Sequence, residues 1–128
     1  MITLFCDLDN TLIYSHRKSL NAPKRVAEML HNKEQSYITK KTFDFLSSCR
    51  EVSIVAVTAR TMAQYDRVYK LLNCLHSEYA LILNGAVLLK NGLQDKSWLV
   101  NSIREVRNSE PEMNIAKKLL EYYGDKPV

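Results

Sequence analysis

An α/β fold built around a parallel sheet is predicted for this chain of 128 residues. Short apolar runs that suit buried strands recur along roughly the first ninety residues, and segments with helical spacing of apolar residues separate them. Strands that alternate with helices are typical of right-handed crossovers in a parallel sheet. Polar residues follow the strand ends directly, at the edge where open α/β sheets bind ligands. We therefore expect about three core strands with a ligand site at one edge.

The composition is that of an ordinary globular protein, with 46% apolar and 25% charged residues. A net charge of +4 suits anionic substrates such as phosphate esters, but the chain has no long Lys/Arg block, so we expect no nucleic-acid partner. Three cysteines without metal-site spacing indicate reduced thiols in a cytoplasmic protein. There is no signal-peptide pattern and no apolar stretch near the ~20 residues of a membrane span, so we expect no membrane partner.

The first predicted strand, Ile2–Cys6, is a nearly continuous apolar run, which favours a parallel strand buried on both faces. It leads into Asp7 and Asp9, which extended chain projects to the same side, while Leu8 turns toward the core. Two carboxylates this close repel each other unless a cation such as Mg²⁺ relieves them. With that metal, one acid could act as nucleophile and the other as general acid/base, and the hydroxyl of Thr11 could orient the second acid. The simpler alternative is a polar turn.

Residues 13–39 are predicted to contain a β-hairpin. The extended pieces Val26–Leu30 and Gln35–Ile38 flank a turn-like segment, 31–34. His31 at its tip could touch a substrate, but solvated hairpin tips are the commoner case. Thr39 can then cap the helix that follows.

The second buried strand is predicted at Val52–Val57, and it ends in Thr58-Ala59-Arg60. A Thr at the tip of a buried strand, ahead of a helix, places a hydroxyl and backbone N–H groups where an anion can sit. Thr61 can cap the helix predicted over 62–72. For Thr58, an ordinary helix cap is the alternative interpretation.

A third apolar run, Tyr79–Leu83, ends at Asn84-Gly85, and Val87–Lys90 reaches a second tight-turn pair at Asn91-Gly92. From Leu93 onward the pattern favours helices, the second of which opens at Pro111.

The segment Asp7-Leu8-Asp9-Asn10-Thr11-Leu12 resembles the first motif of the haloacid dehalogenase (HAD) superfamily. The resemblance implies a magnesium-dependent phosphohydrolase that works through an aspartyl-phosphate on a small phosphorylated metabolite, for example a sugar phosphate. It makes Asp7 the nucleophile and Asp9 the general acid/base. Both are implied Mg²⁺ ligands, Asp9 through its backbone carbonyl, and Thr11 is a supporting residue of the substrate site.

Two further segments carry the resemblance. Val57-Thr58-Ala59-Arg60 is similar to the second HAD motif, which implies that Thr58 holds the phosphoryl group and that Ala59 adjoins the substrate. Arg60 is expected either to contact the substrate phosphate or to form a salt bridge. Asn84-Gly85-Ala86 resembles the turn after the third strand in the Cof-like and sucrose-phosphatase-like groups, which carry a cap there; a plain hairpin turn fits equally well. The hairpin within about 13–39 corresponds to the flap of these proteins.

The pattern departs from the family in the last quarter of the chain. The catalytic lysine and the final acidic motif have no clear counterparts: Lys117 and Lys118 fit a solvated helix face, and Gly124-Asp125 follows a helical stretch. We therefore expect a HAD-like core over 1–92, the start of a cap over 93–128, and a longer parent protein. An incomplete sheet would leave the Ile2–Cys6 strand as an edge, and self-association through that edge is expected.

Two other functions fit the sequence less completely. A non-catalytic module could bind phosphate or metal with the first two motifs alone. A receiver domain that accepts phosphate on Asp shares the open sheet, but it carries its acceptor on a different strand.

Overall fold

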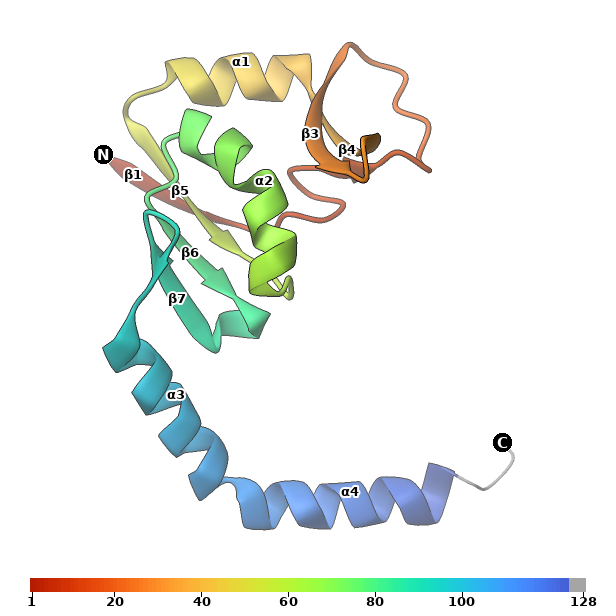
Figure 1. Cartoon of the computed structure of the whole chain (residues 1–128), viewed down its shortest axis with the longest axis vertical. Coiled ribbons are helices and arrows are strands. Elements are labelled where there is room, and N and C mark those ends of the chain that lie inside the picture. The colour runs from red at the N-terminus through yellow and green to blue at the C-terminus, as the bar shows by residue number, and fades with distance from the viewer. Residues whose placement is uncertain (125–128) are drawn as a thin grey trace. The chain divides into compact units, whose positions relative to one another are not determined.

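The computed structural model describes residues 1–124 and divides the chain into two compact units, Met1–Asp95 and Lys96–Val128 (Figure 1). The first unit contains the strands β1 (Ile2–Cys6), β2 (Tyr14–Ser15), β3 (Lys24–Leu30), β4 (Lys33–Thr39), β5 (Val52–Val57), β6 (Tyr79–Ile82), β7 (Val87–Lys90) and β8 (Leu93–Gln94). Its helices are α1 (Lys40–Ser48), α2 (Met62–Cys74) and the 3-10 turn η1 (Leu83–Gly85).

A mixed five-stranded sheet, ordered β1-β5-β6-β7-β8, forms the body of this unit. Strands β1, β5 and β6 run parallel, as expected for the three core strands, whereas β7 and β8 are antiparallel additions. The prediction of a parallel sheet is therefore right for the core and wrong for the last two strands. The reason is the length of the connections, because η1 and the Asn91-Gly92 turn are too short for a parallel crossover.

Helices α1 and α2 make the crossovers between the parallel strands. Successive right-handed crossovers in one direction place both helices on the same face of the sheet. Helix α2 begins at a capping box, in which the Thr61 hydroxyl accepts from the Gln64 N–H and the Gln64 side chain accepts from the Thr61 N–H. The largest fully buried side chains include Tyr65, Val68, Leu72, Ile54, Ile82, Leu89 and Leu8. The core thus lies between α2 and the sheet, and Leu8 ties the loop after β1 to it.

Strand β1 is a sheet edge, and its side chains are largely uncovered. Ile2 is 64% exposed, Leu4 43% and Phe5 66%, so the expected burial on both faces is wrong. The physical reason is that β1 pairs only with β5, and within residues 1–124 no strand pairs with its outer edge. The strand has the composition of a central strand in the position of an edge strand.

The predicted hairpin is present as β3 and β4, with β2 as a third strand beside β4. His31 and Asn32 form its tight turn, with φ of 49° and 60°. Positive φ at both central residues is the signature of a turn whose twist matches that of the two strands. Figure 1 shows this hairpin next to helix α2. We call residues 13–39 the flap.

The second unit consists of α3 (Lys96–Asn108) and α4 (Glu110–Gly124), with Pro111 in the first turn of α4. Neither helix has a buried residue. The prediction of helical structure from Leu93 is wrong by three residues, because Leu93 and Gln94 form β8 against β7. Asp125 lies outside the described residues. None of the helices within residues 1–124 has the length and apolarity needed to cross a membrane.

Candidate functional site

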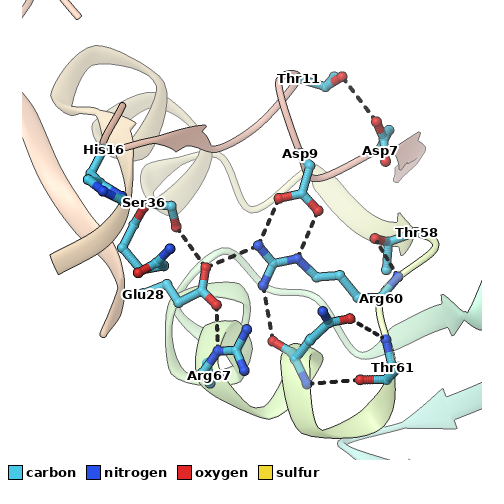
Figure 2. A network of polar contacts seen from close by, with 12 residues as sticks. Asp7, Asp9, Thr11, His16, Glu28, Ser36, Thr58, Arg60, Thr61 and Arg67 are labelled. Atoms are coloured by element: carbon cyan, nitrogen blue, oxygen red, sulfur yellow. Dashed lines mark hydrogen bonds and ion pairs between the residues drawn. The ribbon is translucent and has the colours of Figure 1, made fainter. Parts of the chain in front are cut away.

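All seven predicted site residues lie in the loops that follow β1, β5 and β6, the three parallel strands. Because parallel strands end at the same edge of a sheet, these loops converge. The pairing of Cys6 with Ala56 brings Asp7 and Thr58 to neighbouring strand ends, as Figure 2 shows. The predicted residues are therefore gathered at one site, although each contributes differently.

Asp7 presents an exposed carboxylate at the tip of β1. The Thr11 hydroxyl donates to its Oδ2 over 3.4 Å. Thr11 was expected to orient the second acid, and that expectation is wrong, because the loop folds its side chain back onto Asp7. The loop itself is closed by backbone hydrogen bonds from Thr11, Leu12 and Ile13 to the carbonyl of Leu8, at 3.3, 3.0 and 2.9 Å. A well-ordered turn therefore holds the Asp7 carboxylate toward solvent.

Thr58 is 4% exposed and is held from both sides. Its N–H donates to the Leu81 carbonyl at 2.9 Å, and its own carbonyl accepts from the Asn84 N–H at 3.0 Å. Its hydroxyl oxygen accepts from the Arg60 N–H at 3.3 Å. That contact is a local turn bond, but the hydroxyl can still donate its proton to an anion.

Asn84 supports the site through its backbone. Its φ of 56° lies in the left-handed region, which Asn tolerates better than most residues. This conformation aims its N–H at Thr58, while the neighbouring Leu83 N–H donates to the Arg60 carbonyl at 3.0 Å. The turn after β6 thus fixes the loop after β5.

Asp9 forms a bidentate ion pair with Arg60. The Nε of Arg60 donates to Oδ2 at 2.9 Å and Nη2 donates to Oδ1 at 2.8 Å. These hydrogen bonds lower the pKa of Asp9 below its ordinary value, although partial burial acts in the opposite direction. Of the two roles expected for Arg60, the structure contains the salt bridge, and its partner is the predicted general acid/base. The ion pair keeps Asp9 ionised in this state.

Glu28 on β3 connects the flap to the same arginine. It is 2% exposed, and its Oε2 accepts from Arg60 Nη2 at 3.0 Å and from the Ser36 hydroxyl at 3.1 Å. Its Oε1 accepts from Arg67 Nε at 2.6 Å. Burial raises the pKa of Glu28, but the hydrogen bonds from Arg60, Arg67 and Ser36 outweigh it and the pKa is lowered. Figure 2 shows Arg60 between Asp9 and Glu28.

A polar pocket of about 340 Å³ opens beside these ion pairs, between the flap and the loop after β5. Its lining consists of Asp9, Ser15, Glu28, Gln35, Ser36, Ala59, Arg60, Gln64 and Arg67. Two guanidinium groups and two carboxylates balance each other in charge, and the remaining polar groups are hydroxyls and amides. The pocket suits a small hydrophilic molecule that reaches Asp9.

Glu28 and Arg67 were not identified from the sequence. The one available signal is an acidic residue inside the otherwise apolar segment Val26–Leu30. Its partners are distant in sequence, because Arg60 and Arg67 follow Glu28 by 32 and 39 residues. No local sequence pattern predicts that Glu28 contacts these two arginines, because the contacts depend on the fold.

The site fits Mg²⁺ only in part. Asp7 offers an exposed carboxylate, but the Asp9 carboxylate is engaged by Arg60, and residues 1–124 hold no group of three His, Cys, Asp or Glu side chains that could bind a metal. Mg²⁺ often takes one or two carboxylates and completes its shell with water and substrate phosphate. The described residues therefore fit Mg²⁺ as the companion of a bound phosphate, with the Asp7 carboxylate as a protein ligand. The ion pair with Arg60 engages only the side chain of Asp9, so it does not involve the backbone carbonyl expected to bind the metal.

A scan against models of known protein families finds no match to this chain, and a search of curated proteins finds no similar sequence. The functional argument therefore depends on the geometry of the site and on the motifs that it contains.

Proposed function

We propose that this chain belongs to a HAD-type phosphohydrolase that acts on a small phosphorylated metabolite through an aspartyl-phosphate. The observation that supports this most directly is the meeting of Asp7, Asp9 and Thr58 at the ends of adjacent parallel strands. An exposed carboxylate as nucleophile and a hydroxyl that can donate to the phosphoryl oxygens are two of the groups that covalent phosphoryl transfer needs.

In the proposed reaction, a carboxylate oxygen of Asp7 attacks phosphorus and the bond to the leaving oxygen breaks. Asp9 gives its proton to that oxygen, then accepts a proton from the water that hydrolyses the aspartyl-phosphate and releases inorganic phosphate. The Thr58 hydroxyl donates to a phosphoryl oxygen. Bound Mg²⁺ would offset the charge of the phosphate. Because Arg60 keeps Asp9 ionised, Asp9 must turn away from that arginine and take up a proton from solvent before it can act as an acid.

The pocket beside Asp9 supports a small and hydrophilic leaving group. Its lining has hydroxyl, amide and charged groups, and Ala59 is its only residue with an apolar side chain among those described. A hydroxyl-rich molecule such as a sugar can exchange hydrogen bonds with such a surface, whereas an aromatic group would leave those groups unpaired. This supports a sugar phosphate as the kind of substrate.

One observation favours a second function, a non-catalytic module that binds phosphate or metal. Arg60 occupies both carboxylate oxygens of Asp9, so in this arrangement the predicted general acid/base is engaged in an ion pair. A chain of this kind would bind orthophosphate but would not turn over a phosphate ester.

The deciding experiment is release of orthophosphate from a sugar phosphate such as glucose 6-phosphate, with and without Mg²⁺, by the chain and by its Asp7→Asn variant. We expect hydrolysis that depends on Mg²⁺ and falls by at least about a thousandfold in Asp7→Asn, because the amide cannot attack phosphorus. Asp44→Asn is the matched control, since Asp44 is an exposed acid on α1 that pairs with Lys40.

Equal hydrolysis by wild type and Asp7→Asn would overturn the proposed enzyme. Orthophosphate binding by a wild-type chain without turnover, measured by calorimetry, would instead support the non-catalytic module.

A further inference from the structure

An irregularity in β3 turns Glu28 toward the core. The register of β3 against β4 shifts on both sides of Glu28, between Val26 and Glu28 and again between Glu28 and Met29. As a result the neighbours Ala27 and Glu28 are both buried, at 8% and 2% exposure, although a regular strand alternates between its two faces. Bulges that re-aim a side chain in this way are common next to active sites.

The Glu28 carboxylate contacts two arginines, although one would be enough to balance its charge. Arg67 on α2, with its Nε 2.6 Å from Oε1, is sufficient to pair the buried carboxylate. The other oxygen nevertheless bonds Arg60, which is the residue that holds Asp9. A carboxylate that served only to fasten the flap would not need this second arginine.

Arg60 is held by three segments of the chain. Its Nη1 donates to the Gln64 carbonyl at 3.0 Å, and its Nη2 donates both to Asp9 and to Glu28. Its side chain is only 10% exposed. When Asp9 turns toward a substrate, Glu28 and the Gln64 carbonyl keep the guanidinium in place. Arg60 can then receive Asp9 again in the same geometry after each turnover.

We propose that Glu28 is a positioning residue for Asp9, which acts through Arg60 and makes the geometry of the catalytic acid depend on the docked flap. The inference rests on the proposed function in one respect, because it takes Asp9 to be the general acid/base. The coupling between Glu28 and Asp9 itself is a property of the folded chain and does not depend on any reaction.

The first test is a double-mutant cycle in stability. Urea unfolding is measured for wild type, Glu28→Gln, Asp9→Asn and the double variant. We expect the effects on the unfolding constant to be non-additive by about threefold or more, because both residues share Arg60. Glu34→Gln with Asp9→Asn is the control cycle: Glu34 is exposed on the same hairpin and accepts from the Tyr37 hydroxyl at 2.7 Å. That cycle should be additive.

The second test uses the Mg²⁺-dependent release of orthophosphate from a sugar phosphate such as glucose 6-phosphate, whose leaving oxygen needs a proton from an acid. We expect Glu28→Gln to lower kcat by about tenfold or more with less than about a twofold change in KM, since a loosened Arg60 no longer returns Asp9 to the same position after each turnover while the phosphate contacts remain. Glu34→Gln should leave both constants unchanged. If Glu28→Gln does not fold, Glu28→Asp, which keeps the charge but cannot reach both arginines, replaces it in both tests.

An additive Glu28–Asp9 cycle would overturn the positioning role, and so would a kcat for Glu28→Gln equal to that of Glu34→Gln. A wild-type chain with no hydrolysis would overturn the proposed function, and the stability cycle would still decide whether Glu28 and Asp9 are coupled.

Discussion

Helices α2 and α4 have similar amphipathic patterns and opposite degrees of burial. Helix α2 buries Tyr65, Val68 and Leu72, whereas α4 buries no residue and Leu120 on it is 73% exposed. The periodicity of a helix shows which side chains share a face, but it does not show whether another element covers that face. The stability of the first unit therefore depends on its apolar contacts, and that of α4 within this chain depends mainly on local helix bonds.

The two helices should differ most in how far a Leu→Ala substitution on each lowers the free energy of unfolding. Leu72→Ala should cost about 2–5 kcal/mol, because Leu72 is fully buried and its loss leaves a cavity. Leu120→Ala should change the stability by no more than about 0.5 kcal/mol. Urea unfolding of the two variants measures both effects. Similar costs would show that the α4 face is covered in solution.

The ion pairs of the two helices should also differ in how much they contribute to the free energy of unfolding. Arg67 on α2 pairs with the buried Glu28 at 2.6 Å, while Lys117 and Glu121 on α4 are 3.9 Å apart and exposed. At pH 7, Glu28→Gln should lower the free energy of unfolding by about 2 kcal/mol. This is less than the loss on breaking a fully buried ion pair, because Arg67 is partly exposed. Glu121→Gln should cost no more than about 0.5 kcal/mol.

The difference in ion pairs depends on pH. The pKa of Glu28 is lowered in the folded chain, so its contribution is fully present above the ordinary value of 4.5 and is lost as the pH falls through the lower folded value. The stability gap between wild type and Glu28→Gln should therefore be constant from pH 5 to 7 and narrow below about pH 4.5. A gap that stays constant down to pH 3 would contradict the proposed ionised state of Glu28.

The same comparison shows what the sequence could predict. Local signals predicted several elements correctly: the Thr61 helix cap, the strand Val52–Val57 and the hairpin around His31 are set by residues close in sequence. The predicted site residues meet because parallel strands end together, which follows from topology alone.

Features that depend on distant partners were not predictable. The Arg60–Asp9 pair joins residues 51 positions apart, and Glu28 reaches Arg60 and Arg67 only because a bulge turns it inward. The place of β1 at the edge of the sheet was expected, but the exposure of its side chains was missed, because an apolar strand has the same composition whether or not other elements cover it.

The smallest expected effect concerns the exposed apolar surfaces. Strand β1 offers unpaired backbone groups together with Phe5 at 66% exposure, so we expect two copies of the chain to associate through this edge rather than through α4. Phe5→Lys should weaken the association by about tenfold, or about 1.4 kcal/mol, because a charge on an edge strand opposes pairing. Leu120→Lys is the matched control on α4 and should leave it unchanged. Sedimentation over a concentration series measures the association of the wild type and of both variants. A monomeric wild type, or an association weakened by Leu120→Lys but not by Phe5→Lys, would show that the β1 edge does not mediate association.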